Sequence, residues 1–214
     1  ALHDSGLRVI MDVVYNHTYS LDSPLFKTVP WYFYRKNSDG TPSNGSGCGN
    51  DIASQRSMCA RYILDSVLYW AEEYHMDGFR FDLAGLLDGE TIQEVMEAVR
   101  QIRPDVLFYG EGWNMNTLLT KEKVFLANQQ NAEKLPGFAF FNDSFRDTVK
   151  GTVFDNDAPG YVSGALGQEE WVREGVRGLN SWCKTPEQTI NYVSCHDKMA
   201  LFDRLTQSVP YVEE

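Results

Sequence analysis

Arg80 and Asp82 are the first pair of side chains in this sequence that could do chemistry together. They lie in residues 77–85, where apolar and polar side chains alternate in the pattern of a β-strand. Phe79, Phe81 and Leu83 share the apolar face of this strand. A carboxylate held ionised by a nearby guanidinium at a strand end is typical of an enzyme nucleophile. A structural ion pair is the alternative interpretation.

Two further acids, Glu111 and Asp197, stand at the ends of other predicted strands, as do His17 and His196. Three carboxylates that converge on one rim repel one another, which favours one staying protonated beside an ionised one. Glu111 lies between two glycines and near Trp113, a close-fitting apolar setting that favours its protonated form. A charged nucleophile beside a protonated acid is the pair that glycoside hydrolysis requires, and the third carboxylate would stabilise the transition state.

Other interpretations of these residues remain open. Asp, Glu and His side chains at strand ends also bind divalent ions, although no His-x-His or His-Glu-x-x-His spacing is present. His17 fits a packing or capping role as well as a ligand contact. Asp12 interrupts an apolar run and needs a partner, either structural or in a site. The aromatic residues at 31–34 fit either the core of a small subdomain or stacking on a sugar ring.

The segments that must position these side chains alternate between predicted strands and helices. Strands are expected at residues 7–14, 77–85, 106–109, 138–141 and 189–193. Helices are expected at residues 54–74, 90–103, 121–135 and 168–177, and from 199 onward. Each polar cluster follows a strand, which is the order of a parallel sheet with one functional face.

Residues 19–53 interrupt this alternation as a long irregular insertion, and their aromatic content predicts an ordered loop subdomain. The apolar first strand, at 7–14, is expected to be buried on both faces. Five strands fit part of a (β/α)8 barrel, which needs eight, with strands missing from both ends. They also fit an open doubly wound sheet, but its Gly-rich phosphate turn is absent.

Composition narrows the class of protein. The 214 residues carry a formal net charge of −11, which argues against a nucleic-acid partner. No run of 18 apolar residues occurs, so no membrane span is expected. The spacing of the four cysteines fits neither a C-x-x-C pair nor a zinc signature, which favours free thiols over disulfides. These cysteines are Cys48, Cys59, Cys183 and Cys195.

Four motifs resemble, in order, the conserved regions of the α-amylase superfamily, glycoside hydrolase family 13. They are residues 12–18 (DVVYNHT), 77–83 (DGFRFDL), 110–113 (GEGW) and 192–197 (YVSCHD). The GEGW form and residues 47–51 (GCGND) are most similar to the type I pullulanases of that superfamily. The resemblance covers nearly the whole chain.

The resemblance implies a role for each matching residue. Asp82 would be the nucleophile, Glu111 the acid/base and Asp197 the transition-state stabiliser. Substrate contacts are implied for His17, Arg80, His196, Tyr15, Trp113, Asn50 and Asp51, with Arg80 also orienting the nucleophile. The chemistry needs no cofactor, and Asn16 matches a residue that serves a structural calcium ion in amylases.

The implied fold is α/β, a partial (β/α)8 barrel from the third strand to just past the seventh. Residues 1–214 would form an incomplete catalytic domain, with residues 19–53 as an inserted loop subdomain. The implied activity is retaining hydrolysis of α-1,6 bonds in pullulan and in branched α-glucans such as glycogen or amylopectin.

Two alternatives remain: an α-1,4-acting or isoamylase-like hydrolase of the same superfamily, and a glucan-binding barrel without activity. Lys198-Met199-Ala200 stands where pullulanases often carry Asn followed by a Thr-Leu pair. An isolated chain of these residues is expected to aggregate and to be inactive, because an open barrel exposes sheet edges and apolar interior.

Overall fold

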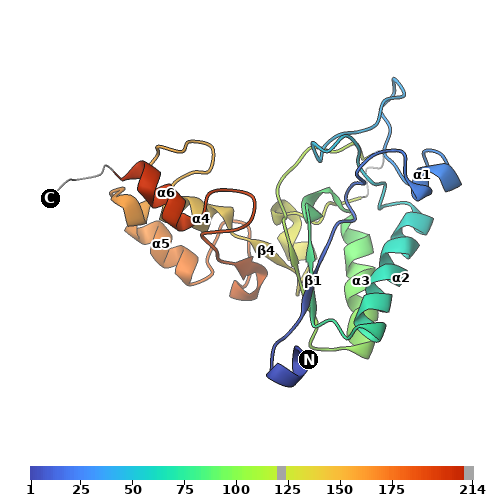
Figure 1. Ribbon diagram of the computed structural model, residues 1–214, viewed down its shortest axis with the longest axis horizontal. Coiled ribbons are helices and arrows are strands. Elements are labelled where there is room, and N and C mark those ends of the chain that lie inside the picture. Colours follow the sequence, from blue (N-terminus) through green and yellow to red (C-terminus); the bar gives the residue numbers. More distant parts are fainter. Residues whose placement is uncertain (120–123, 210–214) are drawn as a thin grey trace. The chain divides into compact units, whose positions relative to one another are not determined.

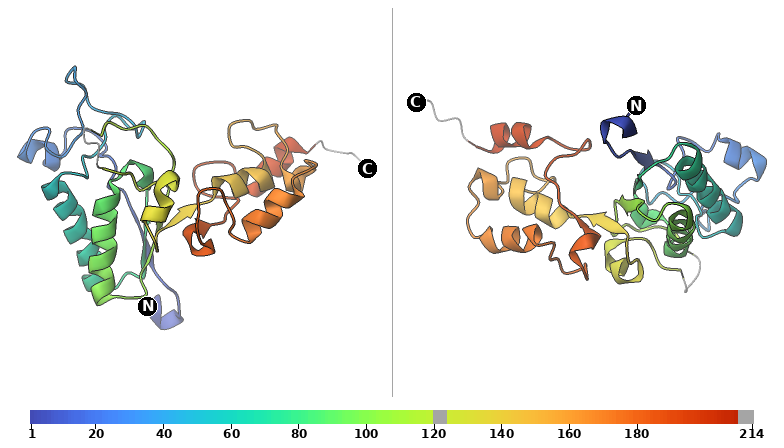
Figure 2. Two further views of the ribbon diagram at one scale, coloured as in Figure 1. Left: turned by 180° about the vertical axis from the view of Figure 1, so that it is seen from behind. Right: turned by 90° about the horizontal axis from the view of Figure 1, so that it is seen from below.

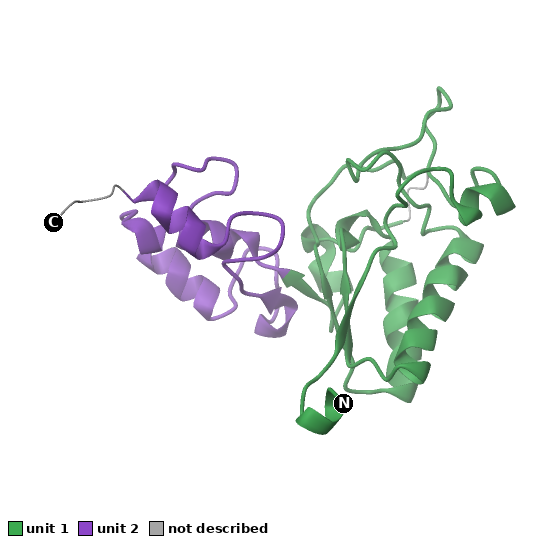
Figure 3. Cartoon of the chain, viewed as in Figure 1, with its two compact units in different colours: residues 1–140 green, residues 141–214 purple. Residues whose placement is uncertain are grey.

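The computed structural model describes residues 1–119 and 124–209, which form two compact units (Figure 3). Unit 1 is Ala1–Phe140 and unit 2 begins at Phe141. The strands are β1 (Ile10–Val13), β2 (Gly78–Phe81), β3 (Leu107–Gly110), β4 (Ala139–Phe141) and β5 (Thr189–Ile190). The α-helices are α1 (Pro24–Thr28), α2 (Ser57–Glu73), α3 (Gly89–Ile102), α4 (Asp143–Lys150), α5 (Glu169–Val176) and α6 (Leu201–Ser208).

The strands form one sheet whose spatial order follows the chain, β1-β2-β3-β4-β5. β1 and β2, β2 and β3, and β3 and β4 pair in parallel. A doubly wound sheet reverses its strand order at a switch point, and the described strands show no such reversal. The α/β prediction is therefore confirmed, and the continuous strand order fits part of a barrel better than a doubly wound sheet.

Two helices, α2 and α3, pack side by side and cover one face of the sheet in unit 1 (Figures 1 and 2). The Asp88 carboxylate starts α3 by accepting hydrogen bonds from the backbone N–H groups of Glu90 and Thr91. Both helices turn an apolar stripe inward, as their periodicity predicts. Their buried apolar residues are Cys59, Ile63, Val67 and Ala71 in α2, and Ile92, Val95, Met96 and Val99 in α3.

Strand β1 is less buried than its apolar sequence predicts. Among the strands that the structure describes, it lies at the edge of the sheet and pairs with β2 alone. Of its residues only Val13 is buried, and Ile10 is 37% exposed. The Asp12 side chain is 56% exposed, so it is not a buried acid. Side chains on an edge strand contact fewer neighbours, which explains why the prediction of burial on both faces is wrong.

Three elements differ from the sequence interpretation. Helix α4 was not predicted; the Asn142 side chain caps it by accepting the N–H of Phe145. In the predicted helix at 121–135, residues 121–123 lie outside the described part, and within 124–135 only Gln129–Lys134 is helical, as a 3-10 helix. Strand β5 has only two residues. Asn128 and Asn142 each accept the backbone N–H three residues further on, which favours the start of a short helix at each position.

The insertion at 19–53 is ordered and packs within unit 1. Tyr34 is fully buried, and its hydroxyl hydrogen-bonds with Ser23 and Thr18. The ring of Phe26 packs against Trp31 and Tyr34. This aromatic group therefore builds a local core, the first of its two predicted roles.

The structure also bears on two predictions from composition. All four cysteines are free thiols, as their spacing predicts. None of the helices within 1–119 and 124–209 combines the length and the apolar character needed to cross a bilayer.

Candidate active site

Arg80 joins three carboxylates at the carboxyl-terminal edge of the sheet. Its Nη1 lies 2.9 Å from Asp12 Oδ1 and 3.0 Å from Asp82 Oδ1, and its Nη2 lies 2.7 Å from Glu111 Oε1. Asp12 and Arg80 are direct partners in the β1–β2 register. Glu111 directly follows β3, which pairs with β2 on its other side. The predicted contact between Arg80 and Asp82 is confirmed, and two neighbouring strands add one acid each.

The charges of this cluster do not balance, because one guanidinium faces three carboxylates. Burial acts to lower the pKa of Arg80, but the charges of Glu111, Asp12 and Asp82 outweigh it and raise the pKa. Arg80 therefore stays charged. The cluster therefore carries more negative than positive charge around one fixed cation.

Asn16 holds the second oxygen of Asp82. Its Nδ2 donates to Asp82 Oδ2 at 2.9 Å and to the Asp82 backbone carbonyl at 2.8 Å, and the side chain is buried. The Asn16 Oδ1 lies 2.6 Å from Nδ1 of His17. Since an amide oxygen only accepts, the proton of this bond belongs to His17 Nδ1. A neutral His17 then presents an unprotonated Nε2.

Glu111 is fixed by both of its carboxylate oxygens. Oε1 contacts Arg80, and Oε2 accepts a hydrogen bond from the backbone N–H of Leu83 at 3.0 Å. The close fit predicted around Glu111 is present, because a Cβ on Gly112 would come 2.1 Å from the ring of Phe140. The prediction of an apolar setting is wrong, because the Arg80 guanidinium lies 2.7 Å from the carboxylate.

Leu83 departs from the strand pattern predicted for residues 77–85. It has φ +38°, in the left-handed region that bulky residues seldom adopt. Strand β2 ends at Phe81, so Leu83 does not continue the apolar face of Phe79 and Phe81. The N–H that donates to Glu111 thus belongs to the turn after β2 and not to the strand.

Asn50 and Asp51, predicted to contact substrate, are buried and bonded within the insertion. Asn50 binds both the backbone N–H and the carbonyl of Thr18. The Asp51 carboxylate accepts from the Ser43 hydroxyl, the Gly45 and Ser46 N–H groups and the Thr117 hydroxyl. Burial acts to raise the pKa of Asp51, but these hydrogen bonds outweigh it and the pKa is lowered. Both side chains hold the loop, and their surroundings do not favour direct contact with a ligand.

Tyr15 and Trp113 differ in how they fit their predicted contacts. The Tyr15 hydroxyl bonds with Ser66 of α2 at 2.7 Å, and its ring packs against Phe81 and Tyr62. Burial raises the pKa of Tyr15. Tyr15 thus packs between sheet and helix, and its substrate contact stays a prediction. Trp113 is half-buried beside Glu111 in sequence, and a sugar contact there stays a prediction.

Asp197 and His196 belong to unit 2 and lie in the turn between β5 and α6. His196 Nε2 is 3.2 Å from Asp197 Oδ1, and both side chains are exposed. The prediction that a strand leads directly to them is wrong, because β5 ends at Ile190. The side chains of the next two residues contact helices instead. Asn191 donates to the Gly175 carbonyl of α5, and the Tyr192 hydroxyl accepts from Arg146 of α4.

Sequence reasoning missed Arg35, a buried arginine that supports the site. Its Nη1 donates to the Leu86 carbonyl and to the Thr117 hydroxyl, both at 2.8 Å, and its other nitrogens reach Ser54 and Gln55. Burial lowers the pKa of Arg35 to about 10. Arg35 thereby ties the insertion to the segments that follow Asp82 and Glu111 in the chain. No sequence pattern around Arg35 distinguishes it from a surface arginine.

The described residues do not bring three His, Cys, Asp or Glu side chains into an arrangement suited to a metal ion. Asn16 is the predicted calcium ligand. Its side-chain oxygen hydrogen-bonds with His17, and its side-chain nitrogen donates to Asp82. The calcium role of Asn16 thus stays a prediction that these contacts do not favour.

No protein-family model matches the chain. It is 46% identical to a pullulanase of Bacillus subtilis over 98% of its residues, which is 30% of that protein. It is 32% identical to pullulanase 1, chloroplastic, of Arabidopsis thaliana, of which it covers 28%. Both alignments run through nearly all of the chain, so the resemblance to pullulanases is confirmed.

Solved structures agree with these relatives. A pullulanase from Paenibacillus barengoltzii, in complex with maltohexaose and α-cyclodextrin, is 47% identical with a TM-score of 0.95; the match covers 99% of this chain and 34% of that one. Type I pullulanase from Bacillus subtilis, in complex with maltose, is 44% identical with a TM-score of 0.92, over 100% of this chain and 31% of that one. The chain thus spans about a third of the length of the proteins it matches.

Proposed function

We propose that the protein containing this chain is a retaining glycoside hydrolase of the type I pullulanase kind, which cuts α-1,6 bonds in pullulan and branched α-glucans. The similarity to pullulanases along nearly the whole chain supports this activity. The observation that carries it is the fork of Arg80, with Asp82 on one nitrogen and Glu111 on the other.

In the proposed reaction, Asp82 attacks the anomeric carbon while Glu111 protonates the oxygen of the leaving sugar. Water then hydrolyses the glycosyl-enzyme ester, with Glu111 acting as base. This retaining route needs the two carboxyl groups about 5–5.5 Å apart, and two acids that share one guanidinium are suited to such a spacing. Asn16 and Arg80 hold both oxygens of Asp82, so the nucleophile is oriented before substrate arrives.

Residues from unit 2 complete the proposal. Asp197 would stabilise the positive charge that develops on the sugar ring, and His196 would contact the same sugar. His17 would offer its Nε2 to a sugar hydroxyl, and Trp113 its ring to a sugar face. We further propose that the strands correspond to the third through the seventh of a (β/α)8 barrel, with residues 19–53 inserted after the third.

The test uses the full-length parent protein with pullulan and, separately, linear amylose. We expect maltotriose from pullulan, no products from amylose, and an α-anomer as the first product. Asp82→Asn should lower kcat by roughly 10³-fold or more. Asp105→Asn, a change of an exposed acid, is the matched control and should leave kcat unchanged.

Other outcomes would change the proposal in defined ways. Cleavage of amylose would replace the α-1,6 assignment by an α-1,4 one. Binding of both glucans with no cleavage would indicate a glucan-binding barrel. A calcium role for Asn16 would require that chelation lower the thermal midpoint of the parent protein, and that Asn16→Ala abolish this effect.

A further inference from the structure

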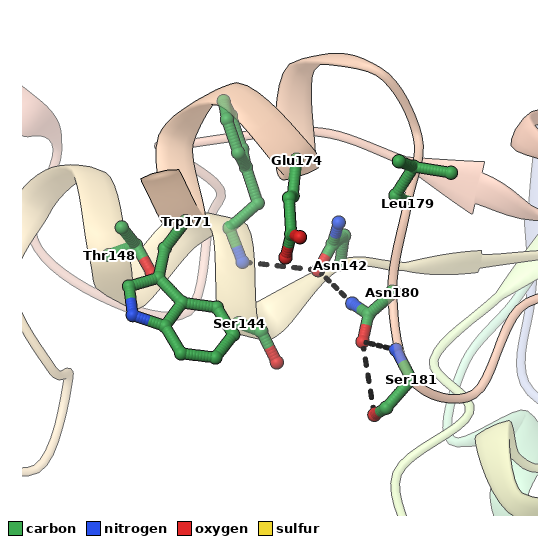
Figure 4. Close-up of a pocket in the computed structure, with 10 residues that line it drawn as sticks. Asn142, Ser144, Thr148, Trp171, Glu174, Leu179, Asn180 and Ser181 are labelled. Carbon is green, nitrogen blue, oxygen red and sulfur yellow. Dashed lines mark hydrogen bonds between the residues drawn. The ribbon is translucent and has the colours of Figure 1, made fainter. Parts of the chain in front are cut away.

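Unit 2 contains a pocket of about 410 Å³ between α4, α5 and residues 179–181 (Figure 4). Ligand pockets in proteins commonly have volumes of 300–1,000 Å³. The residues proposed to carry the hydrolysis are not among those that line it. Its lining residues are Asn142, Ser144, Phe145, Thr148, Trp171, Glu174, Gly175, Leu179, Asn180 and Ser181.

Close packing of two helices fixes the floor of this pocket. Gly175 of α5 lies against the ring of Phe145 of α4, where a Cβ would come 2.3 Å from Cδ2. Residues 179–181, which line the pocket together with the two helices, are held by Asn180, whose Nδ2 donates to the buried Asn142 Oδ1 at 2.8 Å. Asn180 Oδ1 in turn accepts the N–H of Ser181. The pocket is therefore pre-formed by contacts inside unit 2.

The lining combines one flat apolar surface with several polar groups. The indole of Trp171 is exposed, with 63% of the residue accessible to solvent. Figure 4 shows it on one side of the pocket, with Glu174, Asn142 and Asn180 on the other. Within 1–119 and 124–209, the hydroxyls of Ser144 and Thr148 and the Glu174 carboxylate make no hydrogen bond to the protein. These polar groups are available to a ligand.

This combination selects a class of ligand. A pyranose ring has an apolar C–H face that stacks on an indole, and a rim of hydroxyl groups that donate to a carboxylate and exchange hydrogen bonds with hydroxyls. Glu174 is the single charged residue in the lining, so an anion would be repelled. A neutral sugar satisfies both the apolar and the polar side of the pocket.

We infer that the Trp171 pocket is a second carbohydrate site, which binds one or two glucose units of an α-glucan chain by stacking on Trp171 and hydrogen bonding to Ser144, Thr148 and Glu174. The choice of an α-glucan rests on the proposed function. The site would hold a polymeric substrate without taking part in bond cleavage.

The test is calorimetric titration of the full-length parent protein with maltotriose, which has no α-1,6 bond and is not consumed by a debranching enzyme. We expect Trp171→Ala to remove one maltotriose site relative to the unchanged protein. We expect Trp171→Phe to keep that site with about tenfold weaker affinity, because a smaller ring remains to stack. Phe154→Ala, at an aromatic residue that is 89% exposed and outside the pocket, is the control and should lose no site.

Pullulan hydrolysis by the same variants separates this inference from the proposed function. Trp171→Ala should retain kcat on pullulan. Equal numbers of maltotriose sites in Trp171→Ala and the unchanged protein would overturn the second site, whatever the hydrolysis result. Joint loss of all maltotriose binding and of hydrolysis, in a variant with an unchanged thermal midpoint, would also overturn it, since Trp171 would then belong to the cleaving site. Failure of every form to cleave pullulan would overturn only the proposed function, because the titration still compares the two proteins.

If Trp171→Ala lowers the thermal midpoint, Glu174→Gln and Ser144→Ala replace it in the titration. Each removes a polar partner and leaves the indole in place. At least one should weaken the second site severalfold, and unchanged affinity in both would reject the inference.

Discussion

The backbone N–H of Leu83 donates to Glu111 Oε2 at 3.0 Å, and Leu83 does so from a left-handed backbone conformation with φ +38°. A bulky residue in this region costs about 1–2 kcal/mol, and such strain is often found at functional sites. The left-handed residue that follows β2 therefore holds one oxygen of the acid that follows β3.

Leu83→Val should impair the parent protein more than Leu83→Asn, although valine is the closer match to leucine in hydrophobicity. A β-branched side chain is disfavoured at positive φ, whereas asparagine tolerates it. We expect a lower kcat on pullulan and a lower thermal midpoint for Leu83→Val. The reverse order of the two variants would show that side-chain packing, not backbone conformation, controls this turn.

Arg35→Lys should destabilise the protein despite conserving charge. A lysine ammonium cannot donate at once to the Leu86 carbonyl, Thr117 and the groups on the opposite side of the guanidinium. Leaving buried acceptors unpaired costs about 2 kcal/mol, or about 4–8 °C in thermal midpoint for a folding unit of this size. Arg61→Lys, at an exposed arginine that pairs with Asp65, is the matched control and should change little. Equal midpoints for the two variants would contradict the role of Arg35.

Asp51→Asn should give a stability loss that depends on pH. The pKa of Asp51 is lowered in the folded protein, so its ionised form stabilises the fold above the ordinary Asp pKa of about 3.9. This contribution is lost as the pH falls through the lower folded-state pKa. The difference in thermal midpoint between variant and unchanged protein should be largest near neutral pH and should narrow below about pH 4. A difference that stays constant over this range would show that the charge of Asp51 is not what stabilises the loop.

Cys59 should resist alkylation while Cys48 reacts. Burial raises the pKa of the Cys59 thiol to about 12, and the side chain is not accessible, whereas Cys48 is exposed. Thiolate is the reactive form, so iodoacetamide at pH 8 should label Cys48 alone of the two. Peptide mass spectrometry measures the alkylation of each cysteine. As the control, both Cys48 and Cys59 should be labelled when the protein is unfolded in urea. Labelling of Cys59 without denaturant would mean that α2 opens readily.

The sequence predicts the elements of unit 1 because their signals are local. The apolar stripes of α2 and α3 and the alternation around Arg80 are each contained in a few turns or a few residues. The pairing of Arg80 with Asp82 follows from alternation alone. Glu111 joins the same guanidinium because β3 pairs with β2, a contact that the order of polar strand ends already indicates.

Other features depend on tertiary contacts that leave no local pattern. Asn50 and Asp51 look like exposed polar residues of a loop, and only the folded loop shows them buried and bonded to its backbone. Tyr15 looks like a residue of the catalytic rim because it precedes Asn16 and His17, but in the folded chain its hydroxyl bonds with Ser66 of α2. Helix α4 has the length of two turns and starts directly after β4, so its periodicity is too short to separate from a loop.

The three carboxylates around Arg80 also make the cluster a test of strand register. Asp12 reaches the guanidinium only when β1 is paired as it is, and Glu111 only when β3 is. A slip of either strand by one residue would turn its acid to the opposite face of the sheet. The buried Arg80 guanidinium would then lose one of its three carboxylate partners. The ion pairs that reward the correct strand register are therefore made by residues of the proposed site, so strand pairing and the geometry of that site depend on the same contacts.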